Sequence, residues 1–168
     1  MTAYKFLRAG RIAPFSGFEW PVGSWVEAET RVACGAGIHA CRVADLPFWL
    51  LDELWEIELG DEITQGAHKV VAKRGRLVRR VDAWDAEVST EFAAACVDRV
   101  RRLTEGRPEA EGHLADVVAW APHASAAAVA SLAARAWEAA EGGDGYDTER
   151  TAQSAWLAGR LGLHPAGA

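Results

Sequence analysis

The segment from Cys34 to Cys41 holds two cysteines and a histidine within eight residues. Its order, Cys-Gly-Ala-Gly-Ile-His-Ala-Cys, is typical of a turn that leads into a β-strand. Side chains alternate between the two faces of a strand, so His39 and Cys41 are expected on the same face. A thiol beside an imidazole could bind a metal, undergo redox chemistry or act as a nucleophile with its base.

Three of these side chains, Cys34, His39 and Cys41, form a candidate metal-ligand set, and zinc is the metal that such ligands could hold. Structural zinc needs four ligands, usually in two closely spaced pairs, and no second pair is present. Three protein ligands and a water would suit a catalytic metal instead. The alternative is that both thiols are small buried apolar groups and the histidine is a hydrogen-bonded structural residue.

As a catalytic pair, His39 would transfer protons or contact the ligand, and Cys41 would be its partner. An adjacent imidazole can lower the pKa of a thiol and hold the thiolate. Residues two apart on a strand are separated by about 7 Å at Cα, so contact between the two side chains is allowed but not imposed.

Further candidate ligand-binding residues come from three other patterns. Phe18, Trp20 and Trp25 lie in a Pro/Gly-rich segment, where aromatic side chains could line a pocket or cover a small core. Glu56 and Glu58 share one face of an alternating strand. They could act as a paired acid and base, or they could simply form the solvent-exposed face of that strand. Arg76 belongs to a basic cluster over residues 69–80, which could contact phosphate or protect a sheet edge.

The composition limits the classes of protein that fit. Of 168 residues, 50% are hydrophobic and 25% are charged, which is typical of a folded domain and not of a disordered chain. The net charge of −6 disfavours nucleic acid as a partner. No apolar run approaches the roughly 20 residues that cross a bilayer, and no signal-peptide core follows the N-terminus. We therefore expect a cytoplasmic protein with no membrane partner, whose three cysteines are free thiols.

The character of the chain changes near residue 83. Residues 1–82 hold 11 basic and 11 acidic side chains, whereas residues 83–168 hold 7 and 13, so the net charge lies in the second part. We predict an α+β protein: a β-rich lobe over 1–82 with a small, mainly antiparallel sheet, packed with an alanine-rich lobe of about four helices over 83–168. The apolar face of the sheet needs cover, so we expect the helices to pack on it or on a second subunit, as in a homodimer.

Local patterns predict the individual elements. Strands are expected at 4–7, 25–28, 55–59, 68–72 and 76–81, with a turn at 73–75 joining the last two into a hairpin. A short helix is expected from Asp45, as N-cap, to about Leu54. The apolar stripe Val88, Phe92, Cys96, Val100 and Leu103 predicts a first long helix. Two more are expected around 114–121 and after the N-cap Ser125, and a last one over 148–161.

Residues 4–82 resemble a family of uncharacterised actinobacterial and phage domains. Its pattern, Cys-x-x-Gly-x-His-x-Cys, maps onto Cys34, Gly37, His39 and Cys41, and an acidic alternating strand and a Lys-rich stretch follow. This resemblance implies no activity. The helical half is similar to helical immunity-type proteins. The order of glycine, strand, helix and acidic strand is also similar to ADP-ribosyltransferase folds.

These patterns lead to three functional hypotheses. The first is a soluble protein that binds or processes a small molecule at a Cys/His-centred site; whether it is an enzyme stays open. The second is a non-enzymatic interaction or immunity-type protein, whose acidic helices would cover a partner protein. The third is a nucleotide-dependent transferase, as the ADP-ribosyltransferase resemblance implies.

Overall fold

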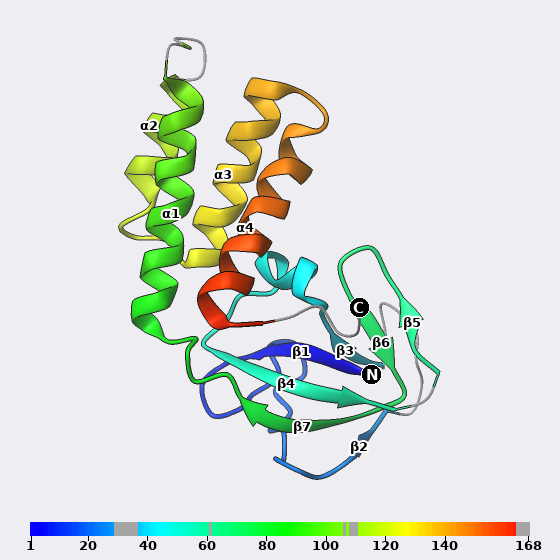
Figure 1. Cartoon of the computed structure of the whole chain (residues 1–168). Coiled ribbons are helices and arrows are strands. Elements are labelled where there is room, and N and C mark those ends of the chain that lie inside the picture. Colours follow the sequence, from blue (N-terminus) through cyan, green and yellow to red (C-terminus); the bar gives the residue numbers. More distant parts are fainter. Residues whose placement is uncertain (29–36, 61, 106, 108–110, 164–168) are drawn as a thin grey trace. The chain divides into compact units, whose positions relative to one another are not determined.

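The computed structural model describes residues 1–28, 37–60, 62–105, 107 and 111–163. Strands occupy the N-terminal part and helices the C-terminal part, so the predicted α+β class is confirmed (Figure 1). The chain divides into two compact units: Met1–Asp85 with the segment from Leu161 onward, and Ala86–Arg160.

The larger sheet of the N-terminal unit has four antiparallel strands in the order β1-β4-β7-β2. These strands are β1 (Thr2–Leu7), β4 (Glu53–Leu59), β7 (Arg74–Arg80) and β2 (Val26–Glu27). The predicted alternation of β4 is confirmed, because Trp55, Ile57 and Leu59 all belong to the buried core while Glu56 and Glu58 are only half-buried.

The smaller sheet has the order β3-β6-β5, with β3 (Ile38–Ala40), β6 (Val70–Ala72) and β5 (Thr64–Gln65). Only Lys73 separates β6 from β7, yet the two strands belong to different sheets. The expected hairpin is therefore wrong, and the chain turns a corner between sheets here. Gly75 makes the corner fit, because a Cβ there would lie 3.1 Å from methyl carbons of Ile38 and Ile57.

The predicted helix from Asp45 to Leu54 is shorter than expected. It is a single 3-10 helix, η1 (Val43–Phe48), and its N-cap is Arg42, whose backbone N–H donates to Asp45 at 3.2 Å. Glu53 and Leu54 instead pair with Leu7 and Phe6 in the ladder between β1 and β4. Sheet pairing therefore ends the helix before residue 54.

The helical unit contains α1 (Ala86–Thr104), α2 (Glu111–Trp120), α3 (Ala126–Glu141) and most of α4 (Gly145–Leu161). All five residues of the predicted α1 stripe are buried. Ser125 caps α3 as predicted, since its side chain accepts from the N–H of Ala128 at 3.3 Å. Among the described helices, none combines the length and the apolar character that crossing a membrane requires.

A buried polar network joins α4 to α1 and α3. Glu149 is fully buried and accepts from Arg99 at 2.8 Å and from the Gln153 amide at 2.9 Å. Gln153 also donates to the carbonyl of Ala130 on α3 at 2.9 Å. Burial raises the pKa of Glu149, and the Arg99 charge opposes this rise. The network fixes the register of α4, because Glu149 and Gln153 reach their partners on α1 and α3 in only one alignment of the helices.

Candidate functional site

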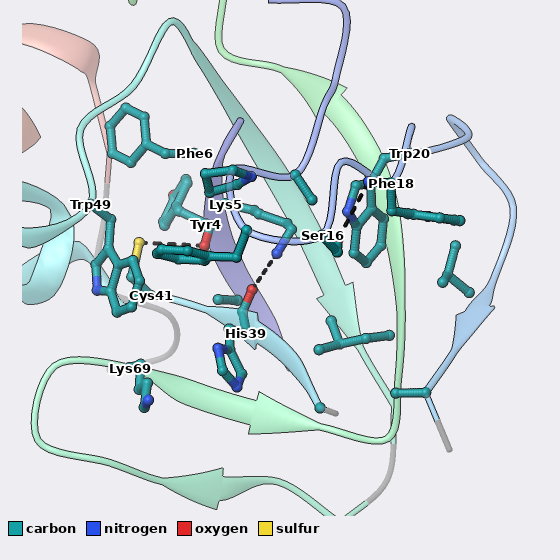
Figure 2. Close-up of a pocket in the computed structure, with 18 of the residues that line it drawn as sticks. Tyr4, Lys5, Phe6, Ser16, Phe18, Trp20, His39, Cys41, Trp49 and Lys69 are labelled. Carbon is teal, nitrogen blue, oxygen red and sulfur yellow. Dashed lines mark hydrogen bonds between the residues drawn. The ribbon is translucent and has the colours of Figure 1, made fainter. Parts of the chain in front are cut away.

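A partly open cavity of about 580 Å³ lies in the N-terminal unit, beside β1, β3 and the loop over residues 13–20 (Figure 2). Ligand pockets in proteins commonly measure about 300–1,000 Å³. Its lining includes the side chains of Tyr4, Lys5, Phe18, Trp20, His39 and Cys41.

The cavity lies where the two sheets are joined. Tyr4 on β1 and Cys41, directly after β3, form an isolated antiparallel bridge, with backbone N–H···O distances of 2.8 and 2.7 Å. This bridge holds β3 beside β1, so residues 37 positions apart in sequence line one hollow.

Lys5 is the most unusual residue of this lining. The alternation of β1 places it on the same face as Ala3 and Leu7, and both of these belong to the apolar core. Its ammonium donates to the backbone carbonyl of His39 at 2.6 Å and lies 4.9 Å from the centre of the Trp20 ring. Desolvation lowers the pKa of Lys5 to about 8, although the Cys41 thiol acts in the opposite direction.

Trp20 is held in place by its backbone. Its N–H donates to the carbonyl of Arg11 at 3.1 Å, and the Arg11 guanidinium donates to the Trp20 carbonyl at 2.9 Å. Arg11 has a φ of 63°, and the preceding Gly10 donates its N–H to Glu53 at 3.0 Å. These contacts fix the indole, which is 4% exposed, against the Lys5 ammonium.

Cys41 is a free thiol that is 1% exposed. Its sulfur donates to the carbonyl of Tyr4 at 3.4 Å (Figure 2). Burial raises the pKa of the thiol well above its usual range, with a further rise from Asp45, while Lys5 and Arg42 lower it. Cys41 therefore remains protonated at neutral pH, a setting that disfavours a thiolate nucleophile.

The side chains of His39 and Cys41 line the same cavity, but Lys5 meets only the backbone of His39. Ile38 and Ala40 belong to the core, so alternation directs His39 and Cys41 to the opposite face of β3. The core-side part of the lining, around Lys5 and Trp20, is thus distinct from the part around His39 and Cys41.

The third candidate metal ligand, Cys34, lies outside the described residues. Within the described part of the chain, no group of three or more His, Cys, Asp or Glu side chains is placed to hold a metal ion.

The aromatic candidates separate into two places. Phe18 and Trp20 line the cavity, with their rings edge to face at 5.8 Å between centroids. Trp25 does not belong to that lining; it lies beside the guanidinium groups of Arg74 and Arg76, at 4.6 and 5.1 Å from its ring centre.

The charged candidates lie elsewhere on the larger sheet. Glu56 pairs with Arg79, and Glu58 pairs with Arg76, each across the ladder between β4 and β7. None of these four side chains lines the cavity. They form cross-strand ion pairs, an arrangement that contributes modestly to sheet stability.

Sequence reasoning missed Lys5, a charged residue that the alternation of β1 places on the same face as core residues Ala3 and Leu7. The available signal is the pattern Ala3-Tyr4-Lys5-Phe6-Leu7, in which one lysine interrupts a strand that is otherwise apolar from residue 3. Such a lysine is ordinarily read as the solvent-facing member of the alternation.

The fold and the site together define an α+β protein whose β-rich unit contains a partly open, aromatic-lined cavity with an amine in its wall. The chain belongs to a family described as a domain of unknown function, DUF7666, whose family model matches residues 1–89. The prediction of an uncharacterised family is confirmed. No significant match is found among curated proteins or among solved structures.

Proposed function

We propose that the N-terminal unit binds a small organic molecule in the cavity beside β1 and β3. The observation that carries this proposal is the Lys5 ammonium in the wall of an aromatic-lined hollow of about 580 Å³. A core that only stabilised the fold would be close-packed and would place no charged group there.

The chemistry of the lining selects the class of ligand. The Trp20 and Phe18 rings favour a planar, apolar body, and the Lys5 amine favours a carbonyl or carboxylate group on it. Aromatic acids, aldehydes and ketones combine these features. We therefore favour the small-molecule hypothesis over the other two functional hypotheses. In this proposal Lys5 replaces the Cys/His pair as the polar group that anchors the ligand.

The test is a screen of aromatic carboxylates and carbonyl compounds by ligand-observed NMR with the full chain. Ser16→Trp adds an indole at an exposed position of the lining, and Val78→Trp adds the same group at an exposed position on β7 away from it. We expect binding to wild type and to Val78→Trp, and at least tenfold weaker binding to Ser16→Trp. Absence of any binder, or equal binding to both variants, would overturn the proposal.

A further inference from the structure

Two contacts position the Lys5 ammonium, and neither of them is an ion pair. No carboxylate among the described residues forms an ion pair with it; its partners are the His39 carbonyl and the face of Trp20. A lysine that loses water without gaining an opposite charge is biased toward its neutral form. With a pKa of about 8, roughly a tenth of the molecules carry a free amine at pH 7.

A neutral lysine amine in an apolar pocket is a nucleophile for carbonyl compounds. We propose that the ligand of this cavity is an aldehyde or ketone and that Nζ of Lys5 forms an imine with it. This inference rests on the proposed function, because it assigns the substrate class and the attacking atom of the same cavity.

The step is balanced without any oxidant or reductant. The Nζ lone pair forms a bond to the carbonyl carbon, and the carbonyl π electrons move to the oxygen, which takes up a proton. The carbinolamine then loses that oxygen as water, and a C=N bond forms. In total Nζ gives up two protons, the oxygen leaves with two, and the reaction is reversible.

The contacts of Lys5 suit the product as well as the free amine. Uptake of one proton from solvent converts the neutral imine into its protonated form, whose single N–H can donate to the His39 carbonyl in place of the ammonium. Its positive charge stays near the Trp20 ring, where a cation is stabilised by the π face. The ligand carbon, doubly bonded to Nζ, would take the place of the other two N–H groups of the ammonium, and the rest of the ligand would extend along the apolar lining that includes Ile38 and Ala40.

The sequence makes this inference simple to test, because Lys5, Lys69 and Lys73 are the only lysines. The full chain would be incubated with 4-fluorobenzaldehyde and sodium cyanoborohydride near pH 7.5, which converts any imine into a stable secondary amine. Peptide mapping by mass spectrometry would measure the labelling rate at each lysine and at the N-terminal amine. Binding of the aldehyde without reductant would be followed in parallel by ¹⁹F NMR.

We expect Lys5 to be labelled at least roughly tenfold faster than Lys73, because an ordinary lysine has far less neutral amine at this pH. The preference should disappear in denaturant, and Ser16→Trp should slow labelling of Lys5 alone. If the aldehyde binds but Lys5 is labelled no faster than Lys73, the imine is refuted and the binding pocket stands. If the aldehyde neither binds nor labels Lys5, the imine is again refuted, and the proposal that the cavity binds aromatic aldehydes is refuted with it.

Discussion

Replacement of Lys5 by methionine should change how the stability of the protein depends on pH. Methionine keeps the length and apolar stem of lysine and removes the charge. The Lys5 pKa is about 8 in the folded protein against 10.5 for an ordinary lysine. Between these values the unfolded chain holds a proton that the folded chain has released, so wild-type stability rises with pH in this window.

The size of the effect follows from the two pKa values. From pH 7 to pH 9.5 the titration of Lys5 should add about 2 kcal/mol to the free energy of unfolding of wild type. The variant lacks this gain. The altered packing of the variant and its missing hydrogen bond to His39 do not depend on pH. They therefore change the difference in free energy of unfolding between wild type and variant by the same amount at every pH. Tyr4 and Cys41, whose pKa values are raised, are present in both proteins and cancel.

The measurement is urea unfolding of wild type and Lys5→Met at several values between pH 7 and pH 9.5, under reducing conditions. Lys73→Met, which removes an exposed lysine of the same unit, controls for the loss of one positive charge. The free-energy difference between wild type and Lys5→Met should climb by about 2 kcal/mol in favour of wild type. A flat difference, or an equal climb for Lys73→Met, would refute the argument that Lys5 is desolvated.

Three further substitutions test the packing of the two units. Gly75→Ala should lower the free energy of unfolding by about 1–2 kcal/mol in urea titrations, because the added methyl group is crowded at the corner between the sheets; an unchanged midpoint would contradict the close approach. Gly145→Ala would press a Cβ against the backbone of α3 and should cost about 2 kcal/mol by thermal unfolding, whereas Gly143→Ala, in open space, should be nearly neutral; equal effects would rule out this crowding. Glu149→Ala should cost about 3 kcal/mol, because it leaves the Arg99 charge without its partner; a loss below about 1 kcal/mol would show that the network adds little.

The elements that sequence reasoning predicted correctly are those that local patterns determine. The α1 stripe has helical spacing over 16 residues, and a helix that buries it is the arrangement that this spacing favours. Ser125 caps α3 because a serine oxygen can satisfy an N–H of the first turn wherever that helix lies. Likewise, the alternation of Trp55, Ile57 and Leu59 determines which face of β4 is buried.

The errors concern residues whose structure depends on distant partners. Nothing local prevents a helix from continuing to Leu54; the pairing of Glu53 and Leu54 with β1 decides against it. The segment around Lys73 has the composition of a hairpin turn, yet β6 finds its partners in β3 and β5. Both cases show tertiary pairing overriding local preference.

Lys5 was missed for the same kind of reason, and its position explains why this lysine is the part of the site most informative about function. A lysine between Ala3 and Leu7 in a strand is unfavourable if the core beside it is close-packed, because the charge would lose its water without compensation. The cavity relieves that cost by leaving room at the amine, and the His39 carbonyl and Trp20 supply partners. The cavity and the lysine therefore depend on each other: a larger side chain in the cavity would bury the amine further, and an apolar residue at position 5 would leave the hollow without a polar anchor. Stability alone would favour a filled core with no charge, so the presence of both features in one site supports the proposal of a bound ligand.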